Sequence, residues 1–317
     1  MSTSREASST IRIKGQEVRV GLLTIGDRDL VISSGFPRLC QIKDEWYHDV
    51  DDVHEILDAL RARPGSADLF TFIDRPPRLS NYEFYKESDN VAALELTNYD
   101  HWWKTQLNSA ARGHVRKSAK SGVHVRVTQF DEILLRGIEQ IYDETPLRQG
   151  KPFWHYRRGL DYLREVHRTF PDRSDFLGAY LGDELVGFIK LVYAGETASL
   201  MHIISKNAHR DKAVTNGLLA KAVEVSCERE IRYLMYDKYD YPVGGSASLL
   251  LFKKNNGFVK LEYPRYFVPL TRRGAFALRH GLQYGLVRRL PGDKVRMLVD
   301  VRNRMLRKWQ ELRHRDA

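Results

Sequence analysis

The chain has 317 residues, with 51 Lys and Arg against 41 Asp and Glu, which gives a formal net charge of +10. Apolar residues make up 42% and charged residues 29%, so the composition excludes wholesale disorder, and the length suits two ordinary domains or one large one. No apolar run approaches the roughly 18 residues of a membrane-spanning helix. Cys40 and Cys227 are too few and too far apart for a disulfide framework or a zinc site, so the sequence implies no metal.

The charge is unevenly distributed along the chain. Residues 272–317 contain 13 basic and 4 acidic residues, a net charge of +9, whereas the residues before them have a net charge of +1. A basic segment on a nearly neutral body predicts a polyanionic partner, either nucleic acid or an anionic membrane. Residues 1–10 are polar and lack the apolar core of a secretory signal, so we expect a cytoplasmic protein.

Apolar periodicity and turn residues predict an alternation of strands and helices in the first half of the chain. In chain order these are a hairpin over 18–32 that turns at Gly26-Asp27, a helix over 50–60, strands over 69–73 and 91–96, a helix over 99–119 and a strand over 123–127. Asp131 is the expected N-cap of a helix that extends to residue 143.

The second half has the clearest pattern. Tight turns at Gly182-Asp183 and Gly195-Glu196 separate three predicted strands, which are followed by helix, strand, helix and strand. The predicted ranges are 176–180, 185–193 and 198–204 for the strands, then 215–229, 231–235, 246–254 and 258–270. This order is typical of an α+β layer arrangement.

Two stretches carry a resemblance to a known family. They are Phe252-Lys-Lys-Asn-Asn-Gly-Phe258, before the last predicted strand, and Thr145-Pro-Leu-Arg-Gln-Gly-Lys-Pro152. With the order of elements, they make residues 99–270 similar to the FemAB-like branch of the GNAT superfamily, in its peptidoglycan-bridge or exopolysaccharide-associated part. Members of that branch transfer aminoacyl or acyl groups in cell-envelope assembly.

The resemblance implies an α+β fold of tandem GNAT-like mixed sheets with flanking helices. We expect residues 1–128 to form a degenerate first GNAT-like half, in which no motif is visible, and residues 129–271 to form the acyltransferase domain. Residues 272–317 would form a basic helical tail.

Individual residues are assigned roles. The resemblance implies that Lys253 stabilises the oxyanion of acyl transfer. Asp237 follows a predicted strand and is a candidate proton acceptor, although its surroundings are equally typical of a turn. The residues expected to bind substrate are Arg148, Gln149, Lys151, Tyr156, His202 and Tyr241. Structural interpretations remain open beside these roles, because Lys253 also suits the last turn of a helix closed by Gly257.

The acyl donor stays open. In GNAT enzymes that use acyl-CoA, a glycine-containing loop at the start of the long helix holds the pyrophosphate on backbone amides. The corresponding residues 206–217 keep Arg210 and Lys212, the expected donor-binding residues, but lack the glycine pair. Acyl-CoA and aminoacyl-tRNA are therefore both candidates.

The last part of the tail has its own pattern. After Pro291, apolar residues that include Trp309 recur every three or four positions, with basic residues largely opposite. A basic amphipathic helix with a Trp is typical of a peripheral protein on an anionic membrane, here the inner face. Docking of the apolar stripe on the body and contact with tRNA are the alternatives.

The sequence thus favours an acyl or aminoacyl transferase that acts on an amine or hydroxyl of a cell-envelope or polysaccharide precursor. One alternative is an acetyl-CoA-dependent N-acetyltransferase for a small amine or nucleotide sugar. The other is a non-catalytic basic protein that binds nucleic acid or a membrane.

Overall fold

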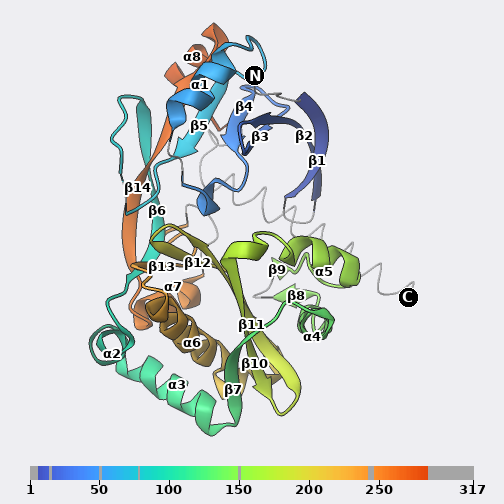
Figure 1. Cartoon of the computed structure of the whole chain (residues 1–317), viewed down its shortest axis with the longest axis vertical. Helices are drawn as coiled ribbons and strands as arrows, with labels where there is room; N and C mark the ends of the chain where they lie inside the picture. The colour runs from blue at the N-terminus through green and yellow to red at the C-terminus, as the bar shows by residue number, and fades with distance from the viewer. Residues whose placement is uncertain are drawn as a thin grey trace. The chain divides into compact units, whose positions relative to one another are not determined.

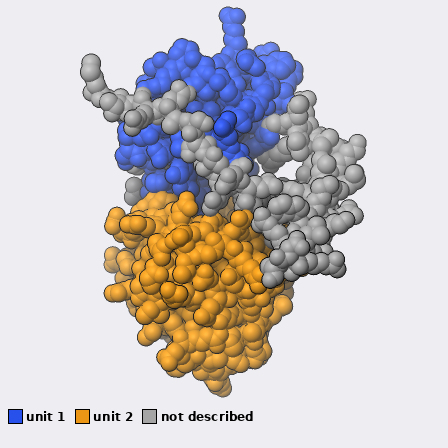
Figure 2. Space-filling model, turned by 90° about the vertical axis from the view of Figure 1, so that its right-hand side faces the viewer, with its two compact units in different colours: residues 1–89, 262–308 blue, residues 90–261, 309–317 orange. Residues whose placement is uncertain are grey.

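The computed structural model describes residues 6–13, 16–49, 52–77, 79–148, 151–241 and 246–284. The chain packs as two compact units, coloured separately in Figure 2: unit 1 is residues 1–89 with 262–308, and unit 2 is residues 90–261 with 309–317. In unit 2, α3 (Ser109–Lys120) packs on the long helix α6 (Val214–Glu228), and β7 (Val123–Thr128) pairs with β10 (Ser174–Leu181).

Unit 1 contains a sheet with helices. Its strands lie in the order β1 (Glu6–Ile13), β2 (Gln16–Ile25), β3 (Arg28–Ile32), β4 (Leu39–Ile42), β5 (Leu69–Ile73) and β14 (Val259–Pro269). The β4–β5 pair is parallel and the neighbouring pairs are antiparallel. The helical elements are η1 (Glu45–Tyr47), α1 (Val53–Arg61), whose N-cap is Asp52, and α8 (Arg272–Arg279). Its core includes a stack of Phe70, Phe72 and Tyr266.

Unit 2 contains both parallel and antiparallel strand pairs (Figure 1). Its strands lie in the order β6 (Tyr85–Glu95), β13 (Tyr233–Met235), β12 (Thr197–Ser205), β11 (Glu184–Ala194), β10 and β7. The remaining helices are α2 (Tyr99–His101), η2 (Trp102–Gln106), α4 (Glu132–Tyr142), α5 (Gly159–His167), η3 (Pro171–Arg173), η4 (Asn207–Lys212) and α7 (Ala247–Asn255). A hairpin of β8 (Leu147–Arg148) and β9 (Lys151–Pro152) follows α4.

Both faces of the sheet in unit 2 are covered, as β11 shows. Val186 and Ile189 belong to the core cluster that includes α6, whereas Leu185 and Phe188 pack with α4 and α5. Because alternate side chains on a strand face opposite sides, a strand buried on both faces has an almost continuous apolar sequence. The predicted α+β class with mixed sheets and flanking helices is confirmed.

Most predicted elements of unit 2 are present, but one helix is interrupted. The sequence predicts a single helix over 99–119, whereas the chain becomes extended at Leu107 and α3 starts after Asn108. The Asn108 side chain accepts a hydrogen bond from the amide of Ala110, which makes it an N-cap. The indole of Trp102 donates to the carbonyl of Asn256, so a tertiary contact fixes the segment before the break.

The predicted basic helix after Pro291 lies outside the described residues. Within the described part of the chain, no helix is long and apolar enough to cross a membrane.

Candidate functional site

Two neighbouring strands of unit 2 separate and leave an opening. β12 and β13 are parallel and pair only where Thr197–Ser199 meets Tyr233–Met235. β13 ends there, while β12 continues to Ser205. Within the described residues, the end of β12 therefore has no strand partner on that side.

A bulge lies just before this end of β12. Lys190 of β11 pairs with His202 and Leu191 pairs with Leu200, so Met201 is an extra residue. A bulge changes the direction of the side chains that follow it. After the bulge, Ile203 packs toward the core that includes α6, whereas His202 faces rings on the opposite side of the sheet.

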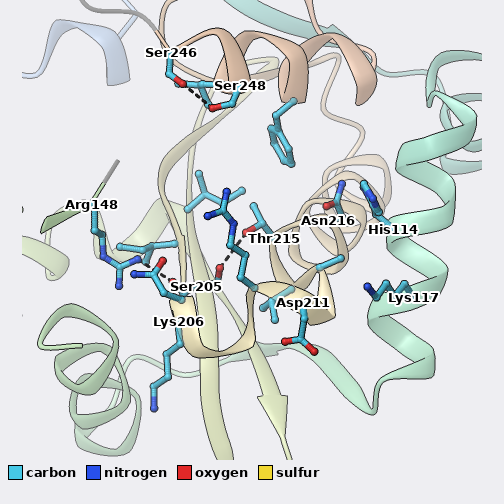
Figure 3. A pocket seen from close by; sticks show the side chains of 18 of the residues that line it. His114, Lys117, Arg148, Ser205, Lys206, Asp211, Thr215, Asn216, Ser246 and Ser248 are labelled. Carbon is cyan, nitrogen blue, oxygen red and sulfur yellow. Dashed lines mark hydrogen bonds between the residues drawn. The ribbon is translucent and has the colours of Figure 1, made fainter. Parts of the chain in front are cut away.

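A pocket of about 870 Å³ opens where the strands separate (Figure 3). Its lining comes from α3, β8, the end of β12, η4, the start of α6, Tyr236 and α7. One part is polar and includes Ser205 and Thr215, whose hydroxyl oxygens are 3.2 Å apart. Another part is apolar and is formed by Tyr236 with Leu249 and Phe252 of α7. This combination suits a ligand with one charged and one apolar portion.

Three exposed basic residues border the pocket, beside Arg148 and Lys206, which pair with Glu144 and Glu184. His114 and Lys117 lie one turn apart on α3, and Arg210 lies on η4. All three are exposed, and none forms an ion pair with a residue in the described ranges. Asp211 also borders the pocket, but its carboxylate pairs with Lys212 at 3.3 Å. An anionic group in the polar part of the pocket would therefore meet a positive potential.

At the start of η4, two backbone amides are hydrogen-bonded to a carboxylate of the protein itself. Glu144 accepts hydrogen bonds from the backbone amides of Asn207 at 2.7 Å and Ala208 at 2.8 Å. The same carboxylate pairs with Arg148 at 3.3 Å. Arg148 donates in turn to the carbonyls of Ser205 at 2.9 Å and Ile141 at 2.6 Å. This Glu144–Arg148 brace joins the end of α4 to the end of β12 and the start of η4.

The Glu144–Arg148 brace is relevant to CoA, one of the two donors that the sequence resemblance implies. In this segment the amides of Asn207 and Ala208 are already hydrogen-bonded to Glu144, and a further anion there would lie against a negative charge. The glycine pair is also missing from the sequence. The residues present therefore do not fit a pyrophosphate held on these amides.

A buried lysine lies behind the apolar part of the pocket. Lys253 has no exposed area, and its ammonium donates to the carbonyl of Lys238 at 2.6 Å and to the hydroxyl of Tyr241 at 3.3 Å. The hydroxyl of Tyr241 donates to the carboxylate of Asp237 at 2.8 Å. The ammonium also lies 4.7 Å from the ring centre of Tyr236, which lines the pocket. We call Lys253, Tyr241 and Asp237 the buried relay.

Burial changes the proton affinities in the relay. Desolvation lowers the pKa of Lys253 to about 8, although the nearby charge of Asp237 opposes this change. Desolvation and the charge of Asp237 raise the pKa of Tyr241, so its hydroxyl remains protonated. Asp237 itself has a φ angle of 48°, which is uncommon for a residue other than glycine and is often found at functional sites.

His202 belongs to a different group on the other side of β12. Its ring centre is 4.7 Å from that of His167 and 6.0 Å from that of His155. Desolvation lowers the pKa values of His202 to about 3 and of His155 to about 4, so both rings are neutral near pH 7. The hydroxyl of Tyr142 lies 3.2 Å from Nε2 of His167. His202 therefore packs in a buried cluster of rings and does not line the pocket.

The structure thus separates the predicted site residues into groups. Arg148 and Arg210 line the pocket, while Lys253, Asp237 and Tyr241 form the buried relay. The residues that lie outside both groups are Lys151 on β9, Tyr156 in the following turn, Lys212 on η4 and His202. Gln149 lies outside the described residues.

Sequence reasoning missed three residues of the pocket. His114, Lys117 and Tyr236 line it, and no motif marks any of them. The spacing of His114 and Lys117 on one helical face is the only available signal, and it is equally typical of a solvated face. Among the described residues, no group of His, Cys, Asp and Glu side chains could hold a metal ion.

Comparison with known proteins places this geometry in a structural family. No protein-family model matches the chain, and no curated protein matches it in sequence. FemX has a similar structure, with a TM-score of 0.57 and 11% identity over 87% of this chain and 90% of FemX.

Two further solved structures agree with this match. The C-terminal domain of a putative lysylphosphatidylglycerol synthetase from Agrobacterium fabrum has a TM-score of 0.53 and 13% identity, over 83% of this chain and 88% of that domain. L-PGS from Bacillus licheniformis has a TM-score of 0.52 and 15% identity, over 84% of this chain and 88% of that one. Identities this low bear on the fold alone. The chain has the fold shared by FemX and these two structures.

Proposed function

We propose that the protein is an acyl or aminoacyl transferase that acts on an amine or hydroxyl of a cell-envelope or polysaccharide precursor. The observation that carries this proposal is the pocket between the separated strands, with a buried cation behind its apolar part. One structural neighbour is named for the synthesis of lysylphosphatidylglycerol, an aminoacylated lipid, which agrees with this class of acceptor.

The proposed reaction is direct transfer. The amine or hydroxyl of the acceptor attacks the acyl carbonyl, the new C–N or C–O bond forms, the bond from the acyl group to its carrier breaks, and the acceptor loses one proton. Such a step needs aligned substrates, stabilisation of the oxyanion and a route for the proton. No covalent bond to the enzyme is required.

The buried relay can meet two of these needs. The positive charge of Lys253 lies in a poorly solvated environment, where it favours developing negative charge more strongly than it would in water. Because Lys253 has no exposed area, we infer that its effect reaches the pocket through Tyr236, which touches both. Tyr241 and Asp237 form a hydrogen-bonded path along which the proton of the acceptor can move.

The donor follows from the polar part of the pocket. Glu144 takes the amides of Asn207 and Ala208 in the segment before α6, while Lys117 and Arg210 offer side-chain charges and His114 a hydrogen-bonding ring. We therefore favour aminoacyl-tRNA, whose separate phosphates can meet separate cations, over acyl-CoA. Arg148 acts as part of the brace rather than as a direct ligand, because its guanidinium is already bonded to Ser205, Ile141 and Glu144.

The proposal is tested with the purified full chain. Thermal unfolding is measured with CoA, acetyl-CoA and charged tRNA, and transfer of a labelled acyl group to an acceptor amine is then followed with the donor that stabilises the protein. Lys253→Met is expected to lower kcat at least tenfold, whereas Lys254→Met, at the exposed neighbouring position, should retain wild-type activity.

Two results would reject the proposal. If no donor shifts the unfolding temperature and none supports transfer, the chain is a binding protein on a transferase fold. If acetyl-CoA alone supports transfer, and only to a small amine or nucleotide sugar, aminoacyl-tRNA and an envelope acceptor are both rejected and the acetyl-CoA-dependent N-acetyltransferase is the correct alternative.

A further inference from the structure

The helix α8 packs on the rest of unit 1 through its small residues. Gly274 and Ala277 are buried, and a Cβ atom on Gly274 would lie 1.9 Å from the carbonyl oxygen of Asp68. The helix backbone therefore lies directly against the chain at the start of β5. Because the small residues face inward, the large aromatic residue of the helix, Phe276, is left 55% exposed.

A second exposed aromatic residue lies beside this helix. Phe36 is 41% exposed, and the guanidinium of Arg273 lies 5.5 Å from the centre of its ring. Phe36, Arg272, Arg273 and Phe276 line a groove of about 420 Å³. We call these four residues the α8 surface. Exposed aromatic residues gathered in one groove are unusual for a surface that faces only water.

The charge of the α8 surface is uniform. Arg272, Arg273 and Arg279 are exposed, and none of them forms an ion pair with another described residue. The sequence contains no Asp or Glu between Leu270 and Gly292, and residues 272–317 carry the net charge of +9. Lone arginines beside phenylalanine rings are the combination that binds an anionic lipid interface, because the rings enter the acyl boundary while the guanidinium groups meet phosphates.

We propose that the α8 surface binds an anionic phospholipid bilayer. We favour a lipid bilayer over nucleic acid because both phenylalanine rings are exposed beside the arginines, so the rings can enter the acyl boundary while the guanidinium groups meet lipid phosphates. The α8 surface lies entirely in unit 1, and the proposed transfer pocket lies entirely in unit 2. Binding to lipid and transfer chemistry are therefore separable by mutation.

The test uses the full chain and sedimentation with vesicles. One set of vesicles contains phosphatidylglycerol and phosphatidylcholine, and the other contains phosphatidylcholine alone. The variants are Phe36→Ser with Phe276→Ser, and Arg272→Gln with Arg273→Gln. The matched control, Arg19→Gln with Lys86→Gln, removes the same charge from exposed strand positions of unit 1.

We expect wild type to bind only the vesicles that contain phosphatidylglycerol, and less tightly as salt is added. Each pair of α8 substitutions should weaken that binding about tenfold or more, with the control close to wild type. The substituted side chains are exposed, so the unfolding temperature should stay unchanged. If the variant with both phenylalanines replaced has a lower unfolding temperature, Phe276→Ser alone is used in its place. Transfer to a soluble acceptor should not change.

Three results would overturn the proposal. The first is that the α8 substitutions leave vesicle binding intact. The second is that the control variant loses as much vesicle binding as the α8 variants. The third is that the α8 substitutions reduce binding to RNA but not to vesicles.

Discussion

The ammonium of Lys253 lies 3.3 Å from the hydroxyl oxygen of Tyr241, and that hydroxyl donates to Asp237. A buried cation, a phenol and a carboxylate are thus linked in series beside the pocket of unit 2. Lysine is rarely buried without an acidic partner in direct contact. Here the carbonyl of Lys238 and the rings of Tyr236 and Tyr241 take the place of such a partner.

This arrangement predicts the pH dependence of transfer. Burial lowers the pKa of Lys253 from 10.5 to about 8, so the side chain is charged at pH 7 and loses its charge as the pH rises through 8. If the cation stabilises the oxyanion, kcat falls on the alkaline side with an apparent pKa near 8. The measurement is a kcat profile from pH 6 to about 10. A flat profile across this range, with active Lys253→Met, would contradict the role.

The brace predicts a structural cost at position 144. Glu144→Ala leaves the amides of Asn207 and Ala208 and the guanidinium of Arg148 without their carboxylate. Lost charge-assisted hydrogen bonds of this kind should lower the free energy of unfolding by about 2 kcal/mol. Denaturant unfolding measures the loss. Glu139→Ala, on the helix α4 that precedes Glu144, is the control and should change stability little; equal values for the two variants would argue against the brace.

The pocket cations predict a loss of donor affinity. Lys117→Ala with Arg210→Ala should weaken binding of an anionic donor about tenfold and reduce the dependence of affinity on salt, because fewer phosphates are neutralised. Lys120→Ala, on the same helix as Lys117 but outside the pocket lining, provides the comparison. Titrations at two salt concentrations give both quantities. The assignment fails if Lys120→Ala has the larger effect.

A Gly→Ala substitution should have opposite effects on stability at Gly274, where α8 packs closely, and at Gly113, where there is open space. Gly274→Ala places a methyl group against the carbonyl of Asp68, so it should destabilise the protein by about 3 kcal/mol or more. Gly113→Ala lies in α3 with open space around the new atom, so it should stabilise the protein by about 0.5–1 kcal/mol. Thermal unfolding of the two variants tests both signs, and a neutral Gly274→Ala would show that α8 does not lie as close as described.

Local sequence signals were sufficient for several elements. The turns at Gly182 and Gly195 have positive φ angles, and the strands on either side begin and end within two residues of the predicted ranges. Asp131 caps α4 as predicted, with its carboxylate 2.8 Å from the amide of Leu134. Local signals failed at Leu107, because the break between η2 and α3 depends on the indole contact of Trp102 with residue 256.

The same distinction applies to the candidate site. The sequence by itself determined the α+β class, the position of the basic segment and the helix that carries Lys253 with its neighbours, because these follow from periodicity, composition and short-range spacing. Only the tertiary structure decided that β12 and β13 pair at one end and separate at the other. It also decided that Glu144 accepts hydrogen bonds from the amides of Asn207 and Ala208, and that His202 packs against His167 and does not line the pocket. Each of these depends on groups far apart in the chain, and such groups meet only when the sheet and its covering helices have assembled.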